Sequence, residues 1–225
     1  MAYTFEDQQN KLSSLLGDPN TTTDDQFPLA IRKKEINRGE LQFAIDALDL
    51  REYATGTVAS AQIAIPSDFI QTAFLVVSNY NISNDREISL ADYQRYYNWN
   101  GTPPYFYFWE VSGTRYIQFI GTGVNGETYK LWYYKKPTTE LSANADVSLH
   151  PEEYREGPVY YAAGQLLRQI GKEQEAQIYL AEYNSIVSRA KSITEKSMVN
   201  KEYAMPDFGD TDSSSTDIQG QGWVG

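Results

Sequence analysis

The spacing of apolar residues changes twice along this chain, and these changes constrain the fold more than any single motif does. Up to about Ala54, apolar residues recur at steps of three and four, which is the period of a helix. From there to about Leu149, short runs such as TVASAQIAIP, YFYFWEV and TYKLWYY alternate or are rich in aromatic residues, which is typical of strands. The helical period then returns. We therefore expect a strand-rich segment inserted between two helical segments.

Two helices are predicted before the insert. Thr4, with Asp7 three residues later, is a typical start for a first helix, and Gly17 is a typical end. A second helix is expected from about Phe27 to Leu50. Its expected core-facing stripe consists of Ile31, Ile36, Leu41, Ile45 and Leu48.

Two further helices are predicted after the insert. Pro151 and the acids that follow it begin the third, which Gly157 and Pro158 should kink or restart. A long last helix should run from about Lys172 to Asn200, with the apolar spacing of a helical hairpin. The remainder is acidic and rich in Gly and Ser, a composition that predicts disorder until binding.

These elements define the expected fold class and domains. We predict an α+β protein in which four main helices form an antiparallel bundle from residues 1–54 and 140–202. A small antiparallel β domain should be inserted at residues 55–139, and an extended C-terminal tail should occupy residues 203–225.

One glycine motif invites a cofactor interpretation. GTGVNG at residues 121–126 fits the G-x-G-x-x-G pattern, which holds a dinucleotide only where a strand leads into a helix N-terminus. Here the strand-like run TYKLWYY follows almost at once, and Asn125-Gly126 is itself a turn signal. We therefore predict a hairpin loop and no cofactor.

Charge and composition exclude several functional classes. The chain has 19 Lys and Arg against 30 Asp and Glu, a net charge of −11, which disfavours specific binding to nucleic acid or to an anionic membrane. It has no cysteine, so no disulfide or thiolate metal site is expected. Neither a signal peptide nor a membrane span is visible in the sequence.

Residues typical of catalysis are sparse. The lone histidine, His150, lies beside a predicted helix start, where a capping or surface role is expected. The carboxylate pairs Asp24-Asp25 and Glu152-Glu153 also flank helix starts, where acids are common. No Gly-x-Ser-x-Gly motif presents a serine. We predict no catalytic residue and no metal site.

The middle of the chain concentrates its aromatic residues, among them many of the 18 Tyr and 4 Trp. Three interpretations remain open: a core for the small sheet, a subunit interface, or a stacking platform for a ligand such as a sugar. An interface is favoured by YFYFWEV, whose two faces are both aromatic. The candidate interface residues are Tyr105, Tyr107, Trp109, Trp132 and Tyr134.

Five segments, taken in order over residues 3 to 200, resemble the adaptor or head-to-tail connector (neck) proteins of tailed bacteriophages. These segments are YTFEDQQNKLSSLLGD, AIPSDFI, GTPPYFYFWE, LWYYKKPTTELS and HPEEYREGPVYYAAGQLLRQIGKEQEAQIYLAEYNSIVSRAK. The resemblance rests on the order of these segments along the chain and on their residue patterns.

The resemblance implies a structural virion protein at the head–tail interface, assembled in the host cytoplasm. Such proteins form a ring of about twelve copies beneath the portal, extend the DNA channel and contact tail or neck proteins. DNA passes through without specific binding, no membrane is involved, and the family has no catalytic residues. The C-terminal segment would dock on the portal, and we expect the β insert to point away from the portal. The candidate docking residues are Tyr203, Met205, Phe208, Ile218 and Trp223.

Two other functional classes stay open. A carbohydrate-binding or adhesin module of a phage tail is suggested by the aromatic content. A glycosidase is suggested only by the acidic residues, and would need two carboxyl groups facing one cleft.

Overall fold

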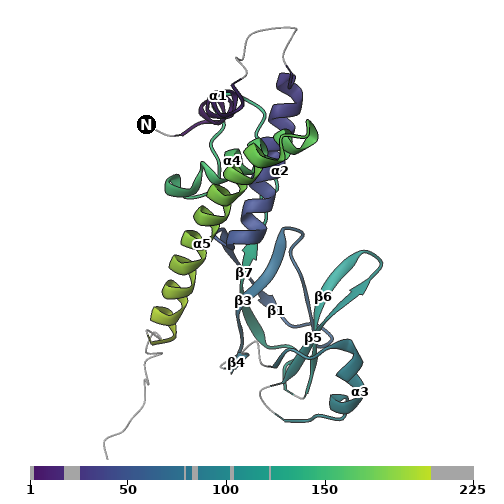
Figure 1. Cartoon of the computed structure of the whole chain (residues 1–225). Helices are drawn as coiled ribbons and strands as arrows, with labels where there is room; N and C mark the ends of the chain where they lie inside the picture. The colour runs from purple at the N-terminus through teal and green to yellow at the C-terminus, as the bar shows by residue number, and fades with distance from the viewer. Residues whose placement is uncertain are drawn as a thin grey trace, which may run out of the picture.

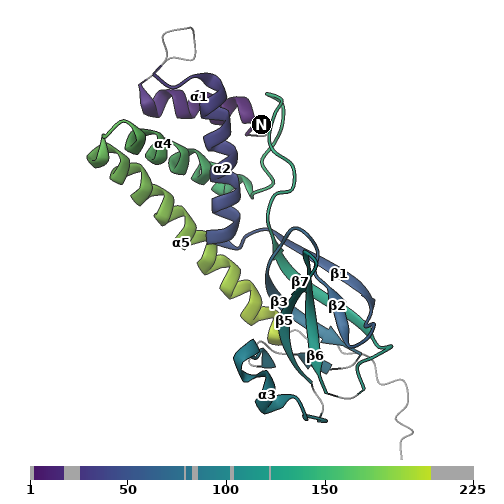
Figure 2. The same ribbon diagram turned by 90° about the vertical axis from the view of Figure 1, so that its right-hand side faces the viewer.

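The computed structural model describes residues 3–17, 26–78, 80–82, 86–101, 104–121 and 123–203, and for 195–203 it describes the backbone only. The α-helices are α1 (Phe5–Leu16), α2 (Leu29–Ala47), α3 (Tyr93–Tyr96), α4 (Gly157–Gln169) and α5 (Glu173–Tyr203). The strands are β1 (Arg51–Thr57), β2 (Gln62–Ala64), β3 (Phe69–Val77), β4 (Tyr80–Ile82), β5 (Tyr105–Val111), β6 (Thr114–Ile120) and β7 (Thr128–Lys135). The strands and α3 gather at one end of the molecule, and α1, α2 and α4 gather at the other (Figure 1). The long helix α5 runs from the helical end toward the strands (Figure 2).

The first helix has the boundaries that its sequence predicts. The Thr4 hydroxyl accepts a hydrogen bond from the Asp7 backbone N–H, and the Asp7 carboxylate accepts one from the Thr4 backbone N–H at 2.8 Å. This reciprocal pair satisfies two backbone donors that the first turn leaves open. Gly17 ends the helix with a φ of 64°, a conformation that glycine adopts without strain.

The restart predicted at Gly157 and Pro158 is also confirmed. A single 3-10 turn, Glu152–Tyr154, precedes α4, and Pro158 lies in the first turn of α4, where a missing N–H costs nothing. Here α4 crosses very close to α2. The approach is so close that a Cβ atom on Gly39 would overlap the Pro158 carbonyl group. Figure 2 shows α1 and α4 running across the direction of α2 instead of alongside it.

Two antiparallel sheets pack face to face at the other end. One has the strand order β1-β7-β3-β4 and the other the order β2-β6-β5. Ser112 and Gly113 both have positive φ and join β5 to β6 as the tight hairpin that the sequence predicts. The shared core consists mainly of Val58, Ile63, Phe69, Leu75, Val77, Ile82, Phe106, Ile117, Phe119, Val124, Leu131 and Tyr133.

The predicted fold class is wrong. The described residues form five α-helices and seven strands in two antiparallel sheets, not a four-helix bundle with a small inserted β domain. One physical reason is the glycine contact of α2 with α4, which favours a close crossing over parallel packing. The other is that the strands run from Arg51 to Lys135 and form a two-layer core of their own.

The hairpin predicted at residues 121–126 is wrong as well. β6 pairs with β2 and β5, whereas β7 pairs with β1 and β3, so this loop crosses from one sheet to the other. Val124 lies buried in the shared core and anchors the crossing. A strand, not a helix, follows the glycines, as the sequence predicts.

Candidate interaction surfaces

The aromatic residues of β5 pack largely against their own chain. The ring centroid of Tyr105 lies 4.5 Å from that of Tyr96, and the centroid of Tyr107 lies 5.3 Å from that of Tyr93. Tyr93 and Tyr96 belong to α3, which therefore covers this face of the three-stranded sheet. Trp109, nearer the hairpin, is exposed. Tyr105 and Tyr107 are therefore half-buried, and only part of each ring is open to another molecule.

The remaining two candidate aromatics lie on the other sheet. Trp132 is opposite Tyr53 of β1 and Phe74 of β3, and these three residues form an aromatic row across three strands on the outer face. Tyr53 and Phe74 are exposed, whereas Tyr134 is buried beneath the Arg51 guanidinium. The five candidates therefore form no single surface, and their contact with a neighbouring subunit stays a prediction.

The predicted docking tail lies almost wholly outside the described residues. Tyr203 is the last residue of α5, where the backbone alone is described. Met205, Phe208, Ile218 and Trp223 fall outside the described residues. Their role in portal docking stays a prediction.

The apolar stripe predicted to bury α2 is mostly on the outside. Ile36 is buried and Leu48 half-buried, but Ile31, Leu41 and Ile45 are 41%, 39% and 43% exposed. The buried face is turned away from these residues and includes charged side chains whose partners are internal: Arg32, for example, donates to the Phe27 carbonyl oxygen at 2.6 Å. That face consists of Arg32, Glu35, Ile36, Gly39, Glu40, Phe43, Ala44 and Ala47.

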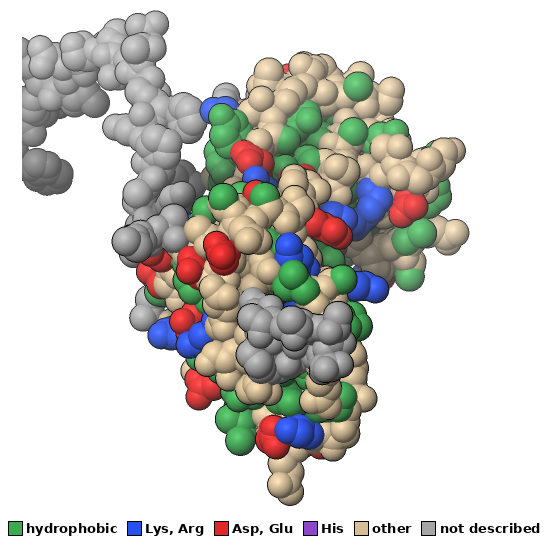
Figure 3. All heavy atoms as spheres, turned by 90° about the horizontal axis from the view of Figure 1, so that it is seen from above, with side chains coloured by type: hydrophobic (Ala, Val, Ile, Leu, Met, Phe, Trp, Pro, Cys, Tyr) green, Lys and Arg blue, Asp and Glu red, His purple; other side chains and the backbone are tan. Residues whose placement is uncertain are grey.

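Apolar side chains therefore reach the surface of the helical end. Seen from that end, they lie among acidic and basic side chains (Figure 3). Single exposed apolar residues are common on proteins, but several along one helix face form a candidate contact surface.

Comparison with protein families agrees with that interpretation. The family model of the SU10 adaptor protein matches residues 3–221, nearly the whole chain. This chain belongs to the SU10 adaptor protein family. No curated protein matches it.

Membership in the SU10 adaptor family makes the chain a phage adaptor protein, a structural virion component that contacts other virion proteins. None of the described helices is both long enough and apolar enough to span a membrane. Within the described residues there is also no group of three or more potential metal ligands among His, Asp and Glu side chains.

The lone histidine of this SU10 adaptor is a core residue, so the predicted capping or surface role is wrong. His150 is fully buried, with Nδ1 2.7 Å from an Asp49 carboxylate oxygen and Nε2 3.1 Å from the Glu40 carbonyl oxygen. The carbonyl oxygen and the ionised Asp49 carboxylate are both acceptors, so this geometry favours the imidazole with a proton on each ring nitrogen. The Glu40 carboxylate in turn accepts from Ser148 and Gln8.

Burial and charge act in opposite directions on this imidazole. Desolvation alone would lower the His150 pKa, but the hydrogen bond and charge of Asp49, with the carboxylate and carbonyl of Glu40, raise the pKa above 6.5. The sequence could not reveal this cluster, because Glu40 and Asp49 lie about a hundred residues before the histidine.

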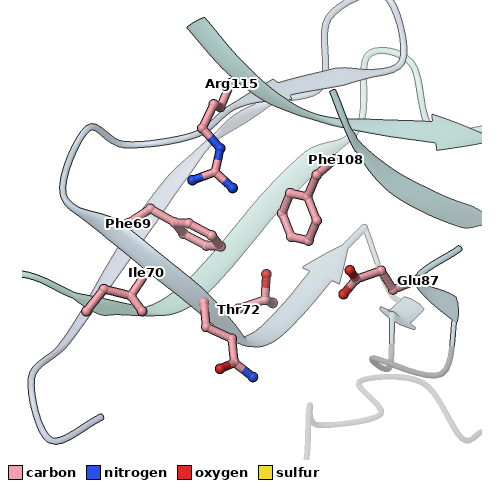
Figure 4. Close-up of a pocket in the computed structure, with 7 residues that line it drawn as sticks. Phe69, Ile70, Thr72, Glu87, Phe108 and Arg115 are labelled. Atoms are coloured by element: carbon pink, nitrogen blue, oxygen red, sulfur yellow. The ribbon is translucent and has the colours of Figure 1, made fainter. Parts of the chain in front are cut away.

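A cavity of about 260 Å³ lies between the sheets (Figure 4). The Arg115 guanidinium lies 5.9 Å from the Phe69 ring centroid and 6.0 Å from that of Phe108. The Glu87 carboxylate also lines the cavity, and burial raises the Glu87 pKa. The buried Thr72 hydroxyl has no hydrogen-bond partner among the described residues. Among the described residues Glu87 is the one carboxylate that lines the cavity, whereas glycoside hydrolysis uses a pair.

Proposed function

We propose that this chain is a ring-forming adaptor that joins the portal to the tail or neck and extends the DNA channel. About twelve copies would close a ring through one repeated head-to-tail contact. The observation that carries the proposal is the family match over residues 3–221. The exposed aliphatic residues of α2 support it, because a neighbouring copy would cover them.

The net charge of the chain suits a DNA conduit. At −11 per copy, a ring repels the phosphate backbone, so the duplex can pass without being held. The assembly would form in the host cytoplasm and remain in the virion at the head–tail interface. The end with the two sheets would point away from the portal, toward tail or neck proteins.

Residues 203–225 are the proposed portal-docking tail. This segment has four Asp and no Lys or Arg, and its apolar anchors would be Met205, Phe208, Ile218 and Trp223. An extended segment of this kind can wrap a large partner surface when it orders on binding.

Co-assembly with the portal protein of the same phage tests the proposal. Native mass spectrometry and negative-stain microscopy should find a ring of the full chain on the portal. The chain shortened to residues 1–202 should lose portal binding, while Phe208→Ala with Trp223→Ala should weaken it. A full chain that neither forms a ring nor binds the portal contradicts the proposal.

Carbohydrate binding is the second candidate function, and the cavity between the sheets is the observation that favours it. Its guanidinium, carboxylate and unpartnered hydroxyl resemble the polar groups that pair with sugar hydroxyls. A glycan array should then give hits that Thr72→Val and Arg115→Ala remove. An array without hits excludes this function.

A further inference from the structure

The outer face of α2 has an unusual composition for a surface helix. Between residues 31 and 45, the exposed positions are Ile31, Lys34, Arg38, Leu41 and Ile45. Their steps of three, four, three and four place them in one seam along the helix. Three of the five are large aliphatic residues and the other two are cationic, so we call these five residues the α2 seam.

A shallow cavity adjoins this surface. A cavity of about 200 Å³ beside α2 has a mixed lining, in which Leu41, Leu141 and Leu149 are accompanied by polar residues and by the carboxylates of Glu40 and Glu140. The α2 seam therefore has a concave neighbour with three leucines in its lining, beside which an apolar side chain from another helix can insert.

The outer face of α5 carries a matching seam of opposite charge. Glu175, Ile178, Glu182 and Ser185 follow one another at steps of three, four and three, and all four are exposed. Ile178 is 63% exposed, whereas the aliphatic residues of the α2 seam are between 39% and 43% exposed. We call these four residues the α5 seam.

The two seams point away from each other within one molecule. α2 and α5 contact through their buried faces, where Phe43 of α2 lies 6.0 Å from Tyr183 of α5 between ring centroids. The Tyr183 hydroxyl also donates to the Asp46 carboxylate at 2.6 Å. A contact between the seams therefore has to join two copies of the chain.

We propose that the α2 seam of one copy packs against the α5 seam of the next copy. This inference rests on the proposed ring and names its subunit contact. Ile178 would insert beside Leu41 and the adjoining cavity, while Lys34 and Arg38, which both lie on one side of Leu41, face one of the two acids that flank Ile178, Glu175 or Glu182 according to the direction of α5.

Existing ion pairs leave these charges available. Arg38 is 3.8 Å from the carboxylate of Glu35, which is buried, and Glu175 is 3.3 Å from Lys172 in an exposed pair, and each pair joins neighbouring turns of one helix. The exposed Lys172–Glu175 pair contributes little, so an intermolecular partner can replace it, and the Arg38 side chain is itself 59% exposed and can reach a second carboxylate. A contact between two different surfaces of the same chain is heterologous, and it closes into a ring when the rotation permits.

Charge reversal tests the inference. Lys34→Glu with Arg38→Glu should weaken self-association at least about tenfold in sedimentation velocity or native mass spectrometry. Glu175→Lys with Glu182→Lys should do the same, and the chain with all four changes should associate again. Far-ultraviolet circular dichroism serves as the folding control, since all four positions are exposed.

The outcomes separate this inference from the proposed function. Rings that persist unchanged in both charge-reversed chains overturn the seam contact and leave the ring proposal standing. A wild-type chain that neither self-associates nor forms a ring on the portal contradicts both.

Disulfide trapping gives a second readout, because the chain has no native cysteine. The chain with Ile45→Cys and Ile178→Cys should form covalent multimers on oxidation, visible as a ladder on a non-reducing gel. Tyr53→Cys with Ile178→Cys is the matched control, since Tyr53 is 61% exposed, more than the 43% of Ile45, but lies on the sheet. A ladder from the control alone overturns the contact.

Discussion

At the scale of single residues, the buried imidazole of His150 ties three parts of the chain together. It links α2 through Glu40, the end of that helix through Asp49, and the segment that leads into α4. Arg155 adds a further bond, from its Nε to the His150 carbonyl oxygen at 2.9 Å. The buried imidazole faces hydrogen-bond acceptors, so it stabilises the fold only while both of its ring nitrogens are protonated.

This cluster predicts how stability depends on pH. The His150 pKa is raised in the folded chain, so protonation favours folding. That stabilisation is fully present below about pH 6.5 and is lost as the pH rises through the folded-state pKa. Urea unfolding between about pH 6 and 9 should show a falling free energy of unfolding, by about 1.4 kcal/mol per unit by which the pKa is raised.

Removing the imidazole provides the control. His150→Gln should reduce the free energy of unfolding at pH 6 by about 3 kcal/mol, because Asp49 loses its buried cation. The fall in stability with rising pH should be smaller in this variant. If His150→Gln has the same pH dependence as the wild type, another group is responsible.

At the scale of elements, the crossing of α2 and α4 depends on Gly39. A Cβ atom there would overlap the Pro158 carbonyl group, which is backbone and cannot move aside easily. Gly39→Ala should therefore lower the free energy of unfolding by about 2 kcal/mol, although alanine favours a helix by about 1 kcal/mol. Thermal unfolding measures the difference.

Gly164 offers a matched comparison within α4. A Cβ atom at this position would meet the Leu180 side chain at 2.6 Å, and this side chain is only half-buried and can change rotamer. Gly164→Ala should therefore cost less than Gly39→Ala. The reverse order would mean that backbone overlap does not control this crossing.

Single elements were predictable where their signals are local, and their assembly was not. Thr4, Asp7 and Gly17 define α1 within a few residues, and Ser112-Gly113 defines a hairpin by its φ angles. The sheet that β7 joins depends instead on long-range packing, because Leu131 and Tyr133 are buried in the core between the two sheets. No local signal at residues 121–126 distinguishes a hairpin from a crossing between sheets.

At the scale of the whole molecule, the apolar pattern of α2 does not match the face that this helix buries in its own chain. Its aliphatic stripe predicts a buried face, yet Ile31, Leu41 and Ile45 are exposed while Arg32 and Glu40 lie inside. Periodicity identifies which residues avoid water but not which surface covers them. The sequence thus identifies the apolar residues of α2, whereas the structure shows that three of them lie outside the core of the monomer.

Exposed aliphatic residues predict separate effects on folding and on assembly. Leu41→Ser with Ile45→Ser should change the free energy of unfolding of the isolated chain by less than about 1 kcal/mol, since both side chains are already partly solvated. Association should lose about 2 kcal/mol, or about thirtyfold in affinity. Sedimentation and denaturation of the same sample measure both, and an equal loss in the two would argue for a core role.

The direction in which salt changes the strength of self-association should show whether the charges across the contact attract or repel. Raising the ionic strength from about 0.1 M to about 1 M shortens the Debye length from about 10 Å to about 3 Å. The wild type and Leu41→Ser with Ile45→Ser should both associate more weakly, because opposite charges are screened. Lys34→Glu with Arg38→Glu should associate more strongly, because there the screened charges repel Glu175 or Glu182. Sedimentation velocity of the three chains measures this, and a salt response of the same sign in all three would place the contact elsewhere.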